Sequence, residues 1–497
     1  MRILYFPIAG ILLLSSCVQH DGVQHGGVQH DDTNRPISNN KLLAAYSMLA
    51  PASDGSVLIY GRVIVDGVLK DSSGCPTIVS ESGNTIKSKQ RQQRPDPSLF
   101  PVTVCEAVLE PNVSYQVAYS NLKLAKSSLE PKNIQIFGDT GCKSKVCNTS
   151  AAEPFKTLAS IAANSPPDLL LHMGDYNYRG TSGSISGNTY AYDAGDGGYG
   201  GKSCGLDETY YSQNSQGSPR PDSWANWNAD FFQSTQALMG SAPWVFARGN
   251  HELCSRAGIG WFYLFGPGAQ FQRSIKQQSC PSQGSYTNPP ATAVEHIAMI
   301  EPYGLPLRNL NVWVFDSANA CDELSTNQLT AQYTQQFEKL NTFAERSNNP
   351  TWVMTHRPIW GVNGVSPLDT INTQLQVALS KTKQKALSDK VALSLSGHMH
   401  LYQSVTPNSD SGRPAQIVVG NSGVSLSNTT DNQSVSVTLD GVQSIVNTQG
   451  KFGYLKIQLK DNALQWQGEM IGENAKAFLV CDPNHATNGK AICEKLD

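Results

Sequence analysis

The sequence predicts an α/β fold in which a larger region of α/β layers, residues 131–480, follows a small β-sandwich, residues 42–130. Two observations along the 497-residue chain carry this prediction. In the first part, β-branched and alternating segments such as residues 115–119 are typical of half-buried strands, and a series of them favours a sandwich. In the second part, short apolar runs alternate with segments of helical composition, which favours layers of sheet and helix.

The first residues predict export. A basic Arg2 precedes the apolar stretch Leu4–Leu14, which is too short to span a bilayer as a stable helix. Small residues and Cys17 follow at once. The pattern resembles a bacterial lipoprotein signal, residues 1–17, in which cleavage exposes Cys17 and that cysteine is then lipidated. An ordinary secretory peptide is the alternative. Residues 18–41 contain a repeated Val-Gln-His unit and are interpreted as a flexible tether.

The cysteines support an exported protein. The chain has eleven, or ten once Cys17 is set aside, and an even number in this context predicts disulfides. A disulfide-closed tail is expected at residues 481–497. No two cysteines form a CxxC pair, which argues against a cysteine-based zinc site. Near neighbours in the sequence suggest Cys75–Cys105, Cys142–Cys147, Cys254–Cys280 and Cys481–Cys493, which leaves Cys204 and Cys321 for each other.

The charge balance says little about partners. The formal net charge is −3, charged residues make up 15% of the chain, and no long run of Lys or Arg is present. Nothing electrostatic therefore predicts a nucleic-acid partner. A small anionic substrate is compatible with this balance, because a metal site supplies its own positive charge. No obligate protein partner is implied.

Five polar clusters each follow or end an apolar run, where open α/β sheets place their sites. Mixed carboxylate, amide and imidazole side chains suit Fe, Zn or Mn, and one carboxylate can bridge two cations. A glycine before the ligand lets the backbone approach an ion closely. The clusters are Gly138-Asp139-Thr140-Gly141, Gly174-Asp175-Tyr176-Asn177-Tyr178, Gly249-Asn250-His251-Glu252, Val353-Met354-Thr355-His356 and Gly397-His398-Met399-His400.

In order and composition these clusters resemble the calcineurin-like metallophosphoesterase superfamily and, within it, the purple acid phosphatases. Gly141 and Tyr178 carry the narrower resemblance, since other members usually have Asp-x-His in the first block and lack the tyrosine. The resemblance spans about residues 133–470. It implies that residues 131–480 are the catalytic domain and form a two-sheet α+β sandwich. It implies an Fe(III) bound by Asp139, Asp175, Tyr178 and His400, and a divalent Fe, Zn or Mn bound by Asp175, Asn250, His356 and His398.

The resemblance also implies an activity. We expect an exported acid phosphatase that hydrolyses phosphomonoesters by attack of a metal-bound hydroxide. The expected catalytic residue is His251, and Asn250, His251 and Arg256 are expected to bind the substrate. A phosphodiesterase or nucleotidase on the same binuclear scaffold is one alternative, and an inactive binding lipoprotein is another. We expect the protein to be anchored to a bacterial membrane by the lipid on Cys17, at the periplasmic or outer-membrane face. Secretion is the alternative.

The sequence departs from the purple acid phosphatase pattern after His356. Many members carry a further histidine there, and residues 357–363 contain none. His296 is a candidate to replace it. His172, just before the second cluster, is interpreted either as a support for the metal ligands or as core packing.

Overall fold

The computed structural model describes most of the unit formed by residues 40–497. The predicted signal peptide, Cys17 and the tether lie outside the described residues. None of the helices in the described ranges is long and apolar enough to cross a membrane. The described ranges are 41–91, 95–142, 153–178, 222–253, 257–268, 299–323, 325, 327–363, 369–427, 434–460, 463–482 and 493–496, with two short strands, β11 (Ser184–Ile185) and β12 (Asn188–Thr189).

The first sheet runs through most of the unit. Its centre is parallel, because β9, β10, β13 and β1 pair side by side in the same direction. The apolar runs predicted as buried strands form this centre. Within the described residues the strand order is β27 (Cys493–Lys495), β26 (Ala477–Cys481), β25 (Trp466–Gly472), β24 (Gly453–Leu459), β9 (Asn133–Phe137), β10 (Leu169–His172), β13 (Trp244–Phe246), β1 (Leu42–Pro51), β2 (Val57–Asp66), β6 (Val102–Leu109) and β5 (Lys89–Gln90).

The second sheet also has a parallel centre, in which β15, β16, β19 and β21 are neighbours. Its inner face shares one hydrophobic core with the first sheet, and the rings of Trp352 and Trp466 lie 6.1 Å apart across the two sheets. Over the described part of the chain the order is β14 (Tyr303–Pro306), β15 (Asn311–Val314), β16 (Thr351–Met354), β19 (Val391–Ser396), β21 (Ala415–Val419), β20 (Tyr402–Pro407), β23 (Val442–Gln449) and β22 (Ser434–Leu439).

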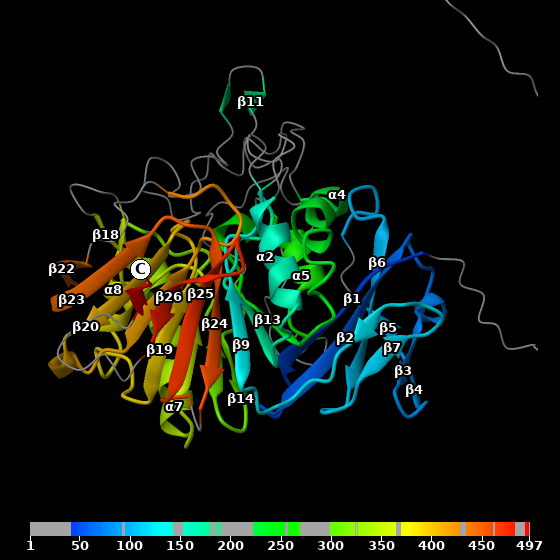
Figure 1. Ribbon diagram of the computed structural model, residues 1–497, viewed down its shortest axis with the longest axis horizontal. Helices are drawn as coiled ribbons and strands as arrows, with labels where there is room; N and C mark the ends of the chain where they lie inside the picture. Colours follow the sequence, from blue (N-terminus) through cyan, green and yellow to red (C-terminus); the bar gives the residue numbers. More distant parts are fainter. Residues whose placement is uncertain are drawn as a thin grey trace, which may run out of the picture. The chain divides into compact units, whose positions relative to one another are not determined.

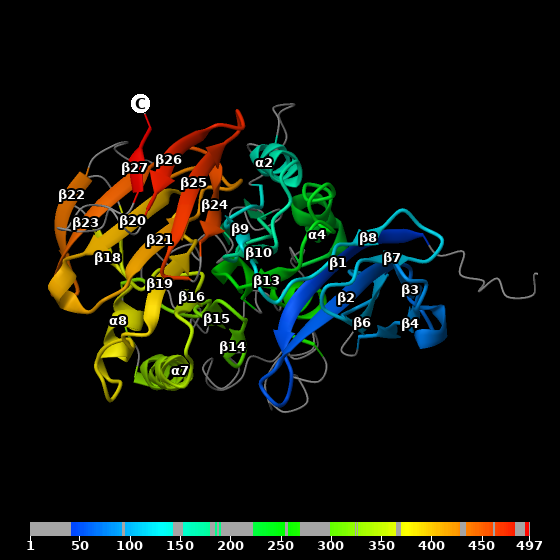
Figure 2. The same ribbon diagram turned by 60° about the horizontal axis from the view of Figure 1, so that its bottom comes forward.

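Helices cover the outer faces of both sheets. Figure 2 shows α2 (Pro154–Ala163) and α4 (Trp224–Trp227) on one side of β9, β10 and β13, and α7 (Asn327–Glu345) and α8 (Thr373–Ser380) beyond the second sheet. Phe155 of α2 packs on Phe137 of β9 with 6.0 Å between ring centres. The predicted two-sheet α/β architecture is confirmed, because two sheets face each other between helical layers.

The amino-terminal part is rich in β-structure, as predicted. A four-stranded sheet of β4 (Thr85–Lys87), β3 (Thr77–Ser80), β7 (Tyr115–Val117) and β8 (Lys123–Leu124) lies beside strands that belong to the first large sheet (Figure 1). β1 pairs in parallel with β13, with Met48 opposite Trp244. The amino-terminal strands therefore continue the sheet that carries the functional site, and the boundary near residue 130 stays a prediction.

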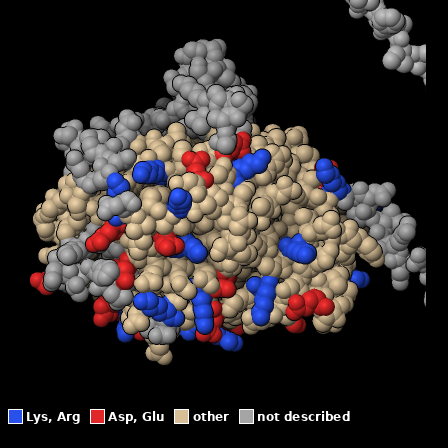
Figure 3. All heavy atoms as spheres, viewed as in Figure 1, with Lys and Arg blue, Asp and Glu red and all other residues tan. Residues whose placement is uncertain are grey.

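Two predicted disulfides are confirmed. Cys75–Cys105 joins the segment before β3 to β6, and Cys481–Cys493 joins β26 to β27. Cys142 and Cys321 are disulfide-bonded as well, but the partners predicted for them, Cys147 and Cys204, lie outside the described residues, as does the pair Cys254–Cys280. On the described surface of the face in Figure 3, acidic and basic side chains are interspersed.

Candidate metal centre

The predicted ligands converge because the strands that precede them end at the same edges of the two sheets. Asp139 follows β9, Asp175 follows β10 and Asn250 follows β13, and these three strands are parallel neighbours. His356 follows β16, and His398 and His400 follow β19, its parallel neighbour in the second sheet. Parallel strands deliver the residues at their carboxyl ends to one place.

The backbone is unusual where these side chains meet. Asp139 (φ 56°), Asp175 (φ 59°), His398 (φ 75°) and His400 (φ 51°) all adopt the left-handed conformation. Each such residue costs about 1–3 kcal/mol and persists only where its surroundings hold it. Strain of this kind clusters at functional sites, so its coincidence with the predicted ligands supports their shared role.

Close packing between the loops explains two of the glycines. A Cβ on Gly249 would lie 2.1 Å from Asp175 Oδ1, and one on Gly174 would lie 2.7 Å from His356 Nδ1. Neither distance is possible for a real side chain. These two glycines are therefore required for the approach of one ligand loop to the next, whereas the sequence pattern was interpreted as an approach to an ion.

Asp175 lies at the centre of the cluster. Its carboxylate belongs to two groups whose ligand atoms lie within 4.8 Å of one another, Asp175 with His356 and His398, and Asp175 with Asp139 and His400. The Tyr178 hydroxyl lies 3.0 Å from Asp139 Oδ1, 2.9 Å from Asp175 Oδ2 and 3.0 Å from His400 Nε2. Asn250 Oδ1 is 2.9 Å from His356 Nε2. The structure thus brings all the predicted ligands together.

The donor atoms fit two cations. Two ligand groups that share one carboxylate are the arrangement that a binuclear centre needs, and their carboxylate, phenol, amide and imidazole donors suit Fe, Zn or Mn. The two central carboxyl groups differ in their electrostatics. Burial, followed by the nearby Asp175, raises the pKa of Asp139 well above its usual range. Burial also disfavours the Asp175 carboxylate, but His356 and His251 hold its pKa well below the usual range.

Two imidazoles are fixed by hydrogen bonds to their outer nitrogens. His356 Nδ1 lies 2.8 Å from the Met173 carbonyl oxygen and donates to it, which leaves Nε2 beside Asp175 Oδ2 at 3.3 Å. His398 Nε2 lies 2.9 Å from Asp322 Oδ2, which leaves Nδ1 for a cation. Bonds of this kind set the tautomer and ring orientation of metal-binding histidines.

His251, the predicted catalytic residue, lies against the same cluster. Its ring centre is 3.8 Å from that of Tyr178, and Nε2 is 4.0 Å from Asp175 Oδ2. Its backbone N–H donates to Asp175 Oδ1 at 2.8 Å. The position suits a group that acts next to the cations, and its catalytic role stays a prediction. Arg256 and His296 lie outside the described residues.

Two further buried residues, His172 and Arg248, lie next to the ligand loops. His172 is buried, with Nε2 2.9 Å from Thr140 Oγ1 and Nδ1 accepting from the Gly174 N–H at 3.2 Å. It therefore bridges the first two ligand loops and also packs in the core. Arg248 is buried in an ion pair with Asp316 at 3.0 Å.

Glu252 organises the loops in a way that the sequence reasoning missed. Its carboxylate accepts backbone N–H groups from Gly249 (3.0 Å), Asp175 (2.9 Å) and Tyr176 (2.8 Å). Burial, and next Asp175, raises the pKa of Glu252 to about 8. Its place inside the third cluster was a usable signal. Asp230, whose Oδ2 accepts the Tyr178 N–H at 2.7 Å, and Asp322 lie in no motif.

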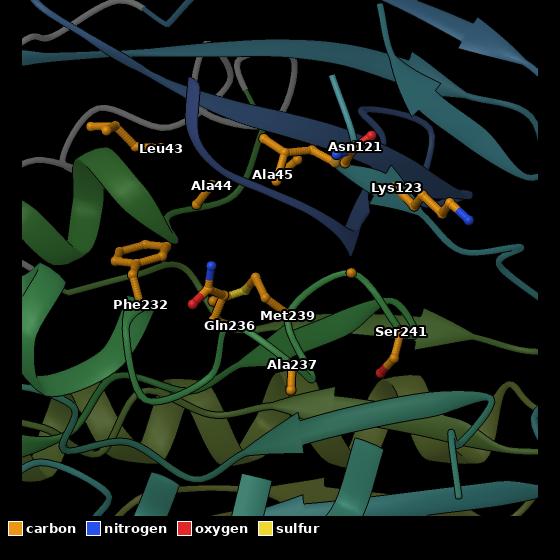
Figure 4. A pocket seen from close by; sticks show the side chains of 12 residues that line it. Leu43, Ala44, Ala45, Asn121, Lys123, Phe232, Gln236, Ala237, Met239 and Ser241 are labelled. Atoms are coloured by element: carbon orange, nitrogen blue, oxygen red, sulfur yellow. The ribbon is translucent and has the colours of Figure 1, made fainter. Parts of the chain in front are cut away.

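A cavity of about 290 Å³ lies elsewhere, between the start of β1, the residues before and within β8, and residues 232–241 (Figure 4). Its lining is mixed, with Leu43, Phe232 and Met239 beside the polar Asn121 and Lys123. None of the residues that line it is a predicted metal ligand or His251, so it is separate from the metal centre.

The chain matches a known protein family and is similar to several solved structures. Residues 133–402 match the family model described as calcineurin-like phosphoesterase. No curated protein sequence matches the chain. Among solved structures, a purple acid phosphatase, PPD1, from yellow lupin (Lupinus luteus) seeds is similar, with 15% identity, 88% of this chain and 73% of that chain covered, and a TM-score of 0.48.

Two further structures are similar over much of the chain. PhoD shares 13% identity, with 92% of each chain covered and a TM-score of 0.49. GAP50, described as the anchor in the inner membrane complex of Plasmodium, shares 13% identity over 74% of this chain and 89% of that chain, with a TM-score of 0.36.

Proposed function

Because the chain belongs to the calcineurin-like phosphoesterase family, we propose that it is an exported acid phosphatase that hydrolyses phosphomonoesters at a binuclear Fe(III)–M(II) centre. The family makes it a metal-dependent hydrolase of phosphoesters. The finer assignment to the iron-containing branch rests on the residues around Tyr178.

The contact between Gly141 and Tyr178 carries that finer assignment. A Cβ on Gly141 would lie 2.6 Å from Tyr178 Cδ2 and 2.5 Å from the Tyr176 carbonyl oxygen. Any larger side chain at position 141 would therefore displace the tyrosine that reaches Asp139 and Asp175. The glycine of the first cluster and the tyrosine of the second act as one unit, which supports a phenolate ligand and hence Fe(III).

The site residues have separable tasks. Two cations bound here would activate water as a nucleophile near neutral pH and provide a positively charged site for the phosphoryl oxygens. Asp175 holds the two ligand groups in one geometry, and Glu252 fixes the loop that carries it. His251, beside Tyr178 and Asp175, is placed to donate a proton to the leaving alkoxide, a step worth about 10²–10⁴-fold.

One substitution tests the mechanism. Asp175→Asn removes the charge shared by both ligand groups, so hydrolysis of a phosphomonoester should fall to background. Retained hydrolysis in this variant would refute the mechanism.

Parallel assays of a mono- and a diester decide between the phosphatase and the phosphodiesterase or nucleotidase alternative. If the protein hydrolyses neither ester, the alternative of an inactive binding lipoprotein is favoured.

Metal content and colour test the iron assignment. Protein purified without a chelator should contain iron and a second metal and should show a tyrosinate-to-iron absorption band. Two equivalents of Zn or Mn without that band would place the protein in the broader family and outside the iron-containing branch.

Export and lipidation are part of the proposal and have their own test. The lipoprotein-like pattern that ends at Cys17 supports them. The full chain expressed in a bacterium should fractionate with membranes, and Cys17→Ala should move it to the soluble fraction. A protein that stays membrane-bound after this change would contradict a lipid anchor at Cys17.

A further inference from the structure

We propose that Asp322 is a positioning residue for the metal centre, one that orients His398 and so sets the affinity of the cation shared by Asp175, His356 and His398. The inference rests on the proposed function, because it assumes that the cluster binds two cations. It concerns a residue outside the five clusters, on the segment between β15 and α7.

The geometry is that of a carboxylate behind a metal-binding imidazole. Asp322 Oδ2 lies 2.9 Å from His398 Nε2 and accepts a hydrogen bond from it. Only Nδ1 then remains as a ligand atom, and a ring nitrogen of His398 lies within 4.8 Å of the donor atoms of Asp175 and His356. His398 has a left-handed backbone (φ 75°), a strained conformation that persists only where surrounding contacts hold it.

Asp322 is itself held on several sides. Its Oδ2 accepts from Arg357 Nη1 and its Oδ1 accepts from Asn372 Nδ2 at 2.8 Å. Its carbonyl oxygen accepts the Thr373 N–H at 2.7 Å, and the preceding residue, Cys321, is disulfide-bonded. A carboxylate fixed in this way can fix the imidazole in turn, because ligand geometry is only as rigid as the groups behind it.

A buried cation accompanies the Asp322 carboxylate. Asp322 is 7% exposed, and Arg357 Nη1 lies 2.5 Å from its Oδ2. Arg357 Nη1 also lies 3.0 Å from His398 Nε2, since both nitrogens converge on the same oxygen. Arg357 stands directly after His356, where the sequence lacks the further histidine, and compensates this carboxylate.

The effect should be confined to one cation. Among the described residues, the hydrogen bonds of the Asp322 side chain go to His398, Arg357 and Asn372, and none of the three belongs to the group of Asp139, Asp175 and His400. His398 contacts Asp139 through its backbone N–H, which Asp322 does not hold. Loss of an outer partner of a metal-binding histidine typically weakens metal affinity by about 10–100-fold. We therefore expect one of two binding steps to weaken and the other to persist.

Zinc titration of the metal-free protein by calorimetry, with a chromogenic chelator as competitor, measures this without any assay of hydrolysis. The wild-type protein should bind two zinc ions. Asp322→Ala should weaken one ion by about 10–100-fold and leave the other unchanged. Asp440→Asn is the matched control, because it breaks another Asp–Arg pair, Asp440 with Arg413 at 3.1 Å, and should leave both affinities unchanged.

A double-mutant cycle separates positioning from a general structural effect. In a His398→Ala background, Asp322→Ala should cause no further loss of zinc affinity. An equal further loss there, or unchanged affinities in Asp322→Ala alone, would overturn the inference. If Asp322→Ala does not fold in chelator, Asp322→Asn takes its place under the same criteria. A wild-type protein that binds fewer than two zinc ions would overturn the proposed function as well, which distinguishes the two failures.

Discussion

A buried ion cluster ties the amino-terminal strands to the segment that follows the Asn250 loop, and Glu106→Gln tests how much it stabilises the fold. Glu106 Oε2 lies 3.2 Å from Arg62 and 2.7 Å from Arg91. The two guanidinium groups also donate to carbonyl oxygens at the carboxyl end of α5 (Gly258–Leu264), Arg62 to Leu264 at 2.6 Å and Arg91 to Phe262 at 3.1 Å.

The expected cost follows from burial and from the count of partners. Arg62 is 0% exposed and Arg91 is 5% exposed, so solvent cannot hydrate either guanidinium group when Glu106 loses its charge. Breaking a buried pair by removing one partner costs about 3–5 kcal/mol. One carboxylate serves two cations here, which favours the upper end of that range. The carbonyl oxygens of α5 remain as acceptors and keep the cost from exceeding it.

Chemical denaturation of the metal-free protein, followed by tryptophan fluorescence, measures the free energy of unfolding. Glu106→Gln should lower the denaturant midpoint with little change in the slope. Glu110→Gln, an exposed position just after β6, is the matched control and should change the free energy of unfolding by no more than about 0.5 kcal/mol. A loss below about 1 kcal/mol for Glu106→Gln would refute the reasoning, because it would mean that the buried cations are compensated without the carboxylate.

Three further predictions concern the metal centre. Gly249→Ala should lower kcat/KM by about 10²-fold or more, because its Cβ would lie 2.1 Å from Asp175 Oδ1 and must displace that ligand; steady-state kinetics with near-normal activity would contradict this. Tyr178→Phe should abolish the tyrosinate-to-iron band in the visible spectrum, and a band that persists would remove Tyr178 from the iron ligands. Dialysis against a chelator should abolish phosphomonoester hydrolysis, and added iron with zinc or manganese should restore it; activity that survives with metal content near zero would contradict a metal-dependent site.

The metal ligands could be predicted from the sequence because each of them is close in the chain to the strand that places it. An apolar run followed by glycine and a ligand is a local pattern, and the parallel order of β9, β10 and β13 then brings Asp139, Asp175 and Asn250 to one edge. Gly141 and Tyr178 could be paired only by resemblance. The structure adds the physical reason, a contact too tight for any Cβ at position 141.

The amino-terminal part shows a limit of the same reasoning. The sequence correctly predicted that residues 42–130 are rich in strands, with β7 among residues 115–119, but it did not predict the neighbour of β1 in the sheet. That neighbour is β13, and the pairing of Met48 with Trp244 joins segments far apart in the chain. Strand identity is a local property of a sequence, whereas sheet membership is decided by which edges remain free when the core closes.

The groups that support the ligands were hard to predict for a related reason. A metal ion restricts its ligands to a few residue types, so histidines and carboxylates after strands stand out in a sequence. The partner of a ligand needs only an acceptor oxygen in the right place. Asp322 meets that need from 76 positions before His398, and Asp230 does so for the Tyr178 N–H from 52 positions away. Glu252 differs because it lies inside a cluster, and it alone of the three had a local signal. The chemistry of an ion can therefore be read from residue types, while the rigidity of its ligands depends on carboxylates that only the folded chain places beside them.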